Sequence, residues 1–204
     1  MNANKNHSVF KVFVSLTAML LMSFSTINNR VISDFSLKDI NGKYVSLKDF
    51  PDAKGFMVLF TCNHCPFANL YYSRMNELNT KYSKLGVPLL AISSSDTINF
   101  EDDTYEMMRQ KAKEEHFNFP FLYDNMQDVA HDFNAQKTPH AYVIWKEQGK
   151  WVVKYNGAID DNGAHADLVQ HHYLSDAVDQ LLSGKEVAVT ETRSIGCQIG
   201  FRKR

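Results

Sequence analysis

The chain has 204 residues, of which 44% are hydrophobic and 12% aromatic; this composition can bury a full core and argues against a disordered or fibrous protein. Lysine and arginine number 22 against 23 acidic residues, a formal net charge of -1, so the chain lacks the basic excess that nucleic-acid binding requires. Length and composition therefore predict a single globular domain.

The N-terminal stretch has the features of an export signal. Lys5 and Lys11 precede an apolar run over residues 12–24, and Ser25 supplies a small side chain after it. We therefore predict a signal peptide over residues 1–25 and an exported protein, located in the periplasm or another extracytoplasmic compartment. The alternative is an uncleaved membrane anchor, which is disfavoured because a bilayer span needs about 20 apolar residues.

A hairpin and a buried strand are the first elements predicted after the signal. Residues 35–37 and 44–47 flank the Asn-Gly dipeptide at 41–42, which tolerates the positive φ angles of a tight hairpin turn. Residues 56–60 form an uninterrupted apolar run, typical of a central strand that is buried on both faces. A pair of cysteines follows this strand directly.

Helices and strands alternate in the middle of the chain. Apolar residues recur at spacings of three and four over residues 66–84, which predicts a helix. Residues 88–93 are interpreted as a second buried strand and residues 102–116 as a second helix. We interpret the acidic residues 101–103 as groups that suit the positive end of this helix dipole, in preference to metal ligands.

The sequence of the last third of the chain predicts a pair of strands followed by a helix. A short strand at 119–123 and a short helix at 126–133 precede two strands, at 141–145 and 151–155, which are close enough to pair as an antiparallel hairpin. A final helix is predicted over residues 166–182. Strands that are joined through helices are expected to be parallel.

Two motifs, together with the C-terminal hairpin and its final helix, carry a family resemblance. Cys-Asn-His-Cys at 62–65 follows a buried strand, and Thr-Pro at 138–139 precedes the hairpin. Together they resemble the thioredoxin superfamily over residues 33–183, with residues 184–204 as a C-terminal tail. Within it, the chain resembles redoxins of the alkyl hydroperoxide reductase/thiol antioxidant (AhpC/TSA) type, in the peroxiredoxin-like group with a Cys-Asn-His-Cys-Pro motif. It is also similar in plan to the exported thiol-disulfide oxidoreductases ResA and TlpA.

The resemblance implies an α/β, thioredoxin-like fold. This fold has a central mixed sheet flanked by helices, here with an N-terminal β-hairpin and a helical insertion before a cis-proline loop. The resemblance also implies that Thr138 and a cis Pro139 lie beside the active cysteines and form the substrate groove, where backbone groups meet a bound peptide. Taken alone, Pro139 would mark only the start of a strand.

The spacing of Cys62 and Cys65 suits thiol-disulfide exchange, in which one thiolate attacks and a second thiol resolves the mixed disulfide. We expect Cys62 to be the exposed attacking thiol with a lowered pKa, and Cys65 to be more buried and to act second. A protonated His64 would stabilise the thiolate and favour an oxidant, whereas the resemblance to ResA and TlpA favours a reductant. No cofactor is required, and the predicted partners are protein thiols or disulfides and an upstream electron donor or acceptor.

Two other functions stay open. A peroxidatic cysteine normally follows a Pro-x-x-x-Thr/Ser-x-x-Cys pattern, whereas Leu59 stands three residues before Cys62, so peroxidase chemistry is disfavoured. A copper- or zinc-binding module would add histidine ligands to the cysteine pair, and no second Cys-x-x-Cys supports it. The candidate histidine ligands are His131, His140, His171 and His172.

The third cysteine, Cys197, lies in an Ile-Gly-Cys-Gln-Ile segment that matches the tail pattern of the same peroxiredoxin-like group. It is interpreted either as a small buried residue of a terminal strand or as a third thiol that resolves a mixed disulfide or links two chains. Because the count of three is odd and two cysteines are close together, no structural disulfide framework is expected.

Overall fold

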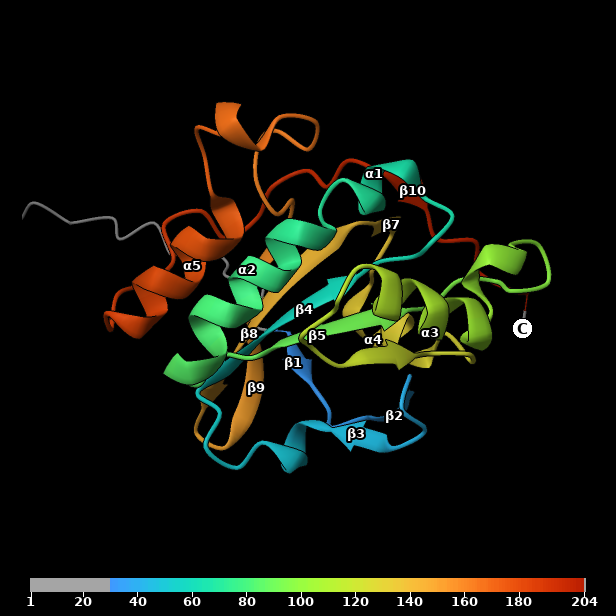
Figure 1. Ribbon diagram of the computed structural model, residues 1–204. Helices are drawn as coiled ribbons and strands as arrows, with labels where there is room; N and C mark the ends of the chain where they lie inside the picture. Colours follow the sequence, from blue (N-terminus) through green and yellow to red (C-terminus); the bar gives the residue numbers. More distant parts are fainter. Residues whose placement is uncertain (1–29, 204) are drawn as a thin grey trace, which may run out of the picture.

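The computed structural model describes residues 30–203 (Figure 1). The predicted signal peptide, residues 1–25, lies outside the described residues and stays a prediction. Within the described part of the chain, no helix has the length and apolar character needed to cross a bilayer.

A mixed sheet of eight strands forms the centre of the described part of the molecule (Figure 1), in the order β1-β9-β8-β4-β5-β6-β2-β3. Its strands β4, β5 and β6 pair in parallel, and β8 pairs with β4 and β9 in antiparallel fashion. A separate two-stranded sheet joins β7 and β10. The bounds of all ten strands are β1 Val31–Ile32, β2 Ser36–Asp39, β3 Tyr44–Ser46, β4 Gly55–Phe60, β5 Leu89–Ser93, β6 Phe121–Tyr123, β7 Lys137–Thr138, β8 His140–Glu147, β9 Lys150–Gly157 and β10 Cys197–Gln198.

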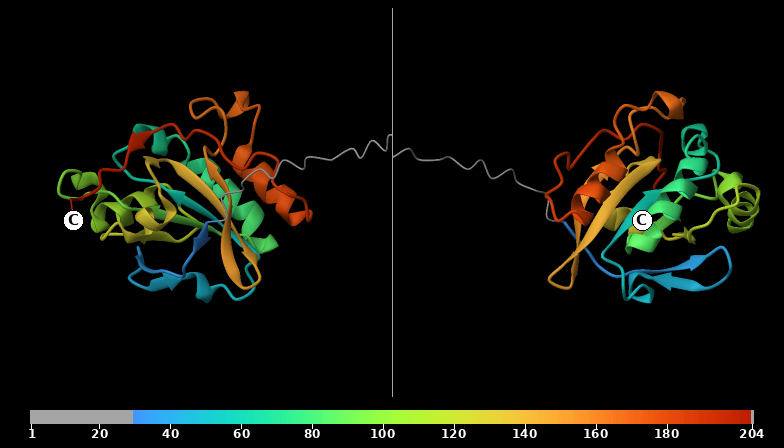
Figure 2. Two further views of the ribbon diagram at one scale, coloured as in Figure 1. Left: turned by 180° about the vertical axis from the view of Figure 1, so that it is seen from behind. Right: turned by 60° about the vertical axis from the view of Figure 1, so that its left-hand side comes forward.

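Helices cover both faces of this sheet (Figure 2). Helices α2, α3 and α5 pack into the hydrophobic core on one face, whereas α4 and the N-terminal strands pack into the core on the other. The helical segments are α1 Pro66–Asn69, α2 Tyr72–Tyr82, α3 Tyr105–Glu114, α4 Asp128–Phe133 and α5 Tyr173–Leu182, with the short 3-10 helices η1 Leu47–Asp49, η2 Ser83–Leu85, η3 Glu101–Asp103 and η4 Ala166–Leu168.

The predicted α/β, thioredoxin-like architecture is confirmed. Every residue of β4 is buried, with Met57 and Leu59 on one face of the sheet and Phe56, Val58 and Phe60 on the other. The predicted N-terminal hairpin is β2 and β3, and the predicted C-terminal hairpin is β8 and β9. Strands β4 to β6 run parallel because helical segments connect them.

The single helix predicted after the cysteine pair is wrong, because it divides into α1 and α2. Between them, the Tyr71 hydroxyl donates a hydrogen bond of 3.0 Å to the carboxylate of Asp160, and the Arg74 guanidinium lies 3.9 Å from the centre of the Tyr71 ring. This contact holds Tyr71 against the loop that follows β9. Phe67 and Leu70, which belong to the apolar face of the predicted helix, are 47% and 46% exposed.

The last helix is shorter than predicted, because α5 begins at Tyr173 and only η4 precedes it. The intervening segment is held as a loop, since Asp161 N–H donates to the His171 carbonyl and Gln170 N–H donates to the Asp161 carboxylate. Leu168, an apolar residue of the predicted helix, lies in this segment and is 58% exposed. His171 lies before the helix, where the sequence predicted it within the helix.

Candidate active site

The cysteine pair lies at the carboxyl end of β4. The Thr61 N–H donates to the Ile92 carbonyl at 2.9 Å, which continues the pairing with β5 up to the cysteines. Cys65 is the N-cap residue of α1, and Pro66 occupies the first turn. Cys62 lies between the end of β4 and the start of α1. The expectation that it is exposed is wrong, because Cys62 and Cys65 are each 0% exposed.

The Thr-Pro loop meets both sulfurs. The Thr138–Pro139 peptide bond is cis, as the family resemblance implied. The Cys62 Sγ lies 3.0 Å from the Thr138 hydroxyl, and the Cys65 Sγ lies 3.1 Å from the Thr138 carbonyl oxygen. The predicted approach of this loop to the cysteines is therefore confirmed, and Thr138 contacts each sulfur with a different atom.

His64 bridges Cys62 and a buried carboxylate. Its Nε2 lies 4.0 Å from the Cys62 Sγ, and its Nδ1 forms a short hydrogen bond with Asp103. A carboxylate only accepts hydrogen bonds, so Nδ1 donates and Nε2 of the neutral ring keeps a free lone pair toward Cys62. The ring also stacks on Phe100, with 3.9 Å between ring centres.

Asp103 is a site residue that the sequence interpretation missed. It is 0% exposed, and its Oδ1 accepts hydrogen bonds from the backbone N–H groups of Asn63 at 2.6 Å and His64 at 3.3 Å. The acidic run was interpreted as capping the next helix, but Thr104 is the N-cap of α3 and Asp103 precedes it. The available signal was its place after β5, because the carboxyl ends of parallel strands share one edge of a sheet.

The two buried thiols shift each other's pKa in opposite directions. Hydrogen bonding with the Cys62 thiol is the main cause that lowers the pKa of Cys65 to about 4. The same contact is the main cause that raises the pKa of Cys62, followed by burial and the negative charge of Asp103. The surroundings thus favour ionisation of Cys65 over that of Cys62, the reverse of the sequence expectation.

Cys62, His64 and Asp103 also place three potential ligand atoms within 4.8 Å of one another. Their polar atoms are already engaged with each other and with Thr138, so a metal ion would have to replace the hydrogen bond between the ring and the carboxylate. Among the described residues, no group of this kind includes any of the histidines proposed from the sequence as metal ligands, His131, His140, His171 and His172.

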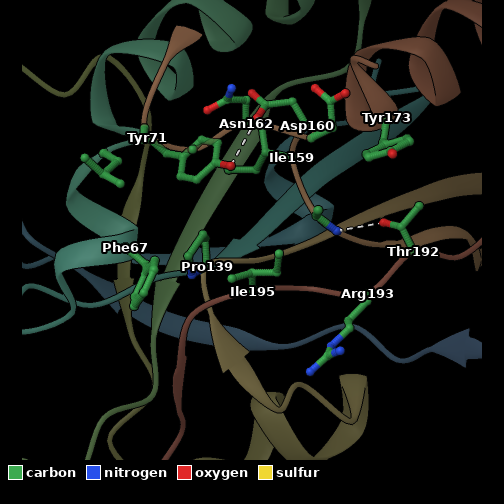
Figure 3. Close-up of a pocket in the computed structure, with 15 residues that line it drawn as sticks. Phe67, Tyr71, Pro139, Ile159, Asp160, Asn162, Tyr173, Thr192, Arg193 and Ile195 are labelled. Carbon is green, nitrogen blue, oxygen red and sulfur yellow. Dashed lines mark hydrogen bonds between the residues drawn. The ribbon is translucent and has the colours of Figure 1, made fainter. Parts of the chain in front are cut away.

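A pocket of about 490 Å³ adjoins the cis-proline Pro139 (Figure 3). Phe67, Pro139 and Ile195 line it together, which brings α1, the Thr-Pro loop and the C-terminal tail to one place. Phe67 is 47% and Ile195 65% exposed. The pocket therefore offers an apolar surface directly beside the Thr-Pro loop.

Known proteins show the same architecture. The structure of an uncharacterized conserved protein from Geobacillus kaustophilus aligns with a TM-score of 0.78 at 30% identity, covering 86% of this chain and 93% of that chain. The exposed lipoprotein thioredoxin Etrx1 from Streptococcus pneumoniae aligns with a TM-score of 0.54 at 15% identity, covering 74% and 99% of the two chains, and thus shares the fold.

A curated relative points to the same superfamily. The thiol-disulfide oxidoreductase ResA from Bacillus thuringiensis subsp. konkukian is 27% identical over 124 residues, which make up 61% of this chain and 66% of the relative. The match thus spans just under two thirds of the relative's length. Residues 29–161 match the model of the AhpC/TSA family, more than half of the chain. The chain is therefore a member of the AhpC/TSA family with a thioredoxin-like fold.

Proposed function

We propose that the protein is a thiol-disulfide oxidoreductase that exchanges electrons with protein thiols and disulfides through Cys62 and Cys65. The observation that carries the proposal is the convergence of both sulfurs on Thr138, with the ring of His64 directed at one of them. Similarity to ResA and membership of the AhpC/TSA family support it. The reaction requires no cofactor.

The two cysteines have different roles in this proposal. Cys62 attacks a partner disulfide: the new bond joins Cys62 to one partner sulfur, and the other partner sulfur leaves as a thiolate. The Nε2 of His64, with its free lone pair, is the base that faces the Cys62 thiol. Cys65, the buried neighbour of Cys62, then attacks the Cys62 sulfur, closes the intramolecular disulfide and releases the reduced partner as a thiolate.

Access to the pair requires a movement, because both sulfurs are fully buried. The apolar pocket beside Pro139 is the surface on which we place the partner protein, since Phe67, Leu70 and Ile195 expose apolar side chains there. Thr138 belongs to the same loop, but its strand β7 is already paired with β10 of the tail. A partner seated in the pocket would thus contact α1 and the tail together.

The test uses one-residue variants of the pair. We expect Cys62→Ser to abolish reduction of a protein disulfide by a small dithiol, because the attacking sulfur is lost. Cys65→Ser should instead accumulate a covalent adduct with the partner, visible on non-reducing gels, because nothing resolves the mixed disulfide. Dithiol-dependent turnover that persists in Cys62→Ser would refute the proposal. Ser73→Ala, on the exposed face of α2, is the control substitution and should keep the turnover of the wild type.

The direction of electron flow follows from the reduction potential of the Cys62–Cys65 couple. A protonated His64 beside Cys62 would favour an oxidant, whereas the similarity to ResA supports a reductant. The reduction potential of thioredoxin is about -270 mV and that of the oxidant DsbA about -120 mV. Equilibration with glutathione buffers, followed by alkylation and mass spectrometry, measures the potential and assigns the direction.

Peroxidase activity is a second candidate, because the hydroxyl of Thr138 lies 3.0 Å from the Cys62 sulfur. This hydroxyl comes from the Thr-Pro loop, whereas Leu59, at the usual position of the activating hydroxyl, is buried in the core. Fast formation of a sulfenic acid at Cys62 by hydrogen peroxide would support this function. Oxidation at the rate of an ordinary free thiol would reject it.

A copper- or zinc-binding module is a third candidate, supported by the trio of Cys62, His64 and Asp103. It predicts stoichiometric metal in protein that is purified under reducing conditions, lost in the Cys62→Ser variant. Metal-free protein with a readily oxidised cysteine pair would reject it. We also propose export through residues 1–25, which N-terminal sequencing of the mature protein would test.

A further inference from the structure

The C-terminal tail crosses the active site as a strand. After α5 the chain returns along the end of β9, where Thr190 and Thr192 form backbone hydrogen bonds with Asn156. It then pairs as β10 with β7, beside α1 (Figure 1). The hydrogen bonds with Asn156 form one anchor of the tail before Cys197, and a second anchor lies beyond it.

The anchor beyond Cys197 is formed by Gln127, a buried residue at the start of α4. Its side-chain amide donates to the Gly200 carbonyl at 2.8 Å and accepts from the Arg202 N–H at 2.8 Å. Between the two anchors, Gly196 approaches the loop so closely that a Cβ there would lie 2.0 Å from the Thr138 carbonyl oxygen. Only glycine allows this approach, so the path of the tail is tightly defined.

This path places Cys197 beside Cys65. In the strand pair, Cys197 stands directly opposite Thr138, whose carbonyl oxygen contacts the Cys65 sulfur at 3.1 Å. The thiol and backbone N–H of Cys197 both act on the Cys65 sulfur, and the side chain packs against the cluster of buried cysteines. The groups that act most strongly on Cys62 are Cys65, Asp103 and Thr138. Cys197 is thus the neighbour of Cys65 rather than of Cys62.

Exposure separates the three thiols. Cys62 and Cys65 are fully buried, whereas Cys197 is only partly buried. The three cysteines form a row in the order Cys62, Cys65, Cys197, and Cys197 is its most exposed member. A sealed pair that must react with another protein needs a route to solvent. The row Cys62, Cys65, Cys197 supplies a second route, in addition to the movement that direct attack by Cys62 requires.

We propose that Cys197 is a third redox thiol, which moves the disulfide of the pair to the surface by exchange at Cys65; this inference rests on the proposed oxidoreductase function. The Cys197 thiolate attacks the Cys65 sulfur of the Cys62–Cys65 disulfide. The bond between Cys197 and Cys65 forms, the bond between Cys65 and Cys62 breaks, and Cys62 leaves as a thiolate that takes up the proton lost by Cys197. No electron enters or leaves.

The surroundings favour this exchange in the oxidised protein. In the dithiol state the pKa of Cys197 is raised to about 11, first by burial and then by hydrogen bonding with Cys65 and by the charge on Cys65. A disulfide at Cys65 carries neither the charge nor the thiol, so the second and third causes disappear. On the other side, Thr138 and His64 contact the sulfur of Cys62 as it leaves.

Tryptic peptides distinguish the two disulfides. Cleavage after Lys54 and Arg74 places Cys62 and Cys65 in one peptide, and cleavage after Arg193 and Arg202 places Cys197 in another. The purified protein is equilibrated in glutathione redox buffer, quenched with acid, alkylated and digested. We expect both the disulfide within one peptide and the link between the two peptides, the latter in monomeric protein.

Variants in which one cysteine is replaced test which of the three thiols are neighbours. Oxidation of Cys62→Ser by diamide should give the Cys65–Cys197 link, whereas Cys65→Ser should give at least about tenfold less link between Cys62 and Cys197, because those sulfurs are not neighbours. The inference is overturned if the two-peptide link is absent from the wild-type protein and from Cys62→Ser, or occurs only between two chains. Failure of Cys197→Ser to form the Cys62–Cys65 disulfide would instead overturn the proposed function.

A matched pair of glycine variants tests the role of the strand. Gly196→Ala must displace the tail from the Thr138 carbonyl and should lower the Cys65–Cys197 link about tenfold, because proximity is lost. Gly200→Ala lies in the same tail, but its Cβ would have its nearest neighbour at 3.8 Å, an ordinary contact, so the link should persist. An undiminished link in Gly196→Ala would show that β10 does not deliver Cys197 to Cys65.

Discussion

Asp103 gives the candidate site its electrostatic character. A fully buried carboxylate needs compensating hydrogen bonds, and here the backbone N–H groups of Asn63 and His64 and the ring of His64 supply them. The carboxylate thereby holds the loop between the cysteines and orients the ring toward Cys62. Its negative charge also raises the pKa of Cys62, so it keeps the proton on that sulfur until a base removes it.

Replacing Asp103 should therefore change the titration of Cys62. In a chain carrying Cys65→Ser and Cys197→Ser, Cys62 is the only thiol, and thiolate absorbance near 240 nm reports its ionisation. We expect Asp103→Asn to lower the pKa of Cys62, because a like charge is removed from a buried site. Asp102→Asn is the control, since Asp102 is exposed and solvent screens its charge. An equal shift in both variants would contradict the assignment.

At the scale of elements, β4 carries the cysteine loop and has little room at its start. Gly55 pairs with Trp145 of β8, and a Cβ on Gly55 would lie 2.3 Å from the Trp145 ring and 2.7 Å from the Ile144 carbonyl oxygen. Neither the ring nor the backbone can move aside without disturbing the strand pair. The close contact between β4 and β8 therefore depends on glycine at this position.

Gly55→Ala tests this dependence. We expect the free energy of unfolding to fall by about 1–3 kcal/mol, the usual cost of overpacking a well-packed core. Urea denaturation of the reduced protein measures the change. Gly200→Ala, which adds the same methyl group in ordinary contact, should stay within about 0.5 kcal/mol of the wild type. A loss of similar size in both variants would refute the steric explanation.

At the scale of the whole molecule, a buried histidine couples the stability of the sheet to pH. His140 follows the cis-proline at the start of β8, is 6% exposed and pairs with Phe60 at the end of β4. Burial is the main cause that lowers the pKa of His140 from 6.5 to about 4. The positive charges of Arg30 and Lys137 act in the same direction.

Stability should therefore fall in mild acid. The unfolded chain binds a proton at His140 as the pH drops below about 6.5, whereas the folded protein binds it only near pH 4. The free energy of unfolding therefore falls by about 3 kcal/mol between these two pH values. This stabilisation is fully present above pH 6.5 and is lost progressively down to pH 4. Denaturation curves between pH 7.5 and 4 measure it. His140→Asn, which keeps an acceptor for the Gln136 N–H, should remove this part of the pH dependence.

Local patterns in the sequence predicted most of the elements and the candidate redox pair. The apolar run of β4, the spacing of Cys62 and Cys65 and the Thr-Pro pair are each readable over a few residues, because strand burial, turn chemistry and disulfide exchange impose short-range patterns. The resemblance that these motifs carry also led to the AhpC/TSA family and to the cis state of Pro139.

Tertiary contacts decided the rest. Asp103 reaches His64 from 39 positions away, and Cys197 reaches the cysteine pair only through the pairing of β10 with β7. The break after α1 likewise depends on Asp160, far along the chain. No local pattern marks such residues, because their partners are chosen by the folding of the sheet. The sequence alone thus predicted the candidate redox cysteines, whereas their burial, the pKa shifts that they cause in each other and the neighbour of Cys65 follow from the assembled structure.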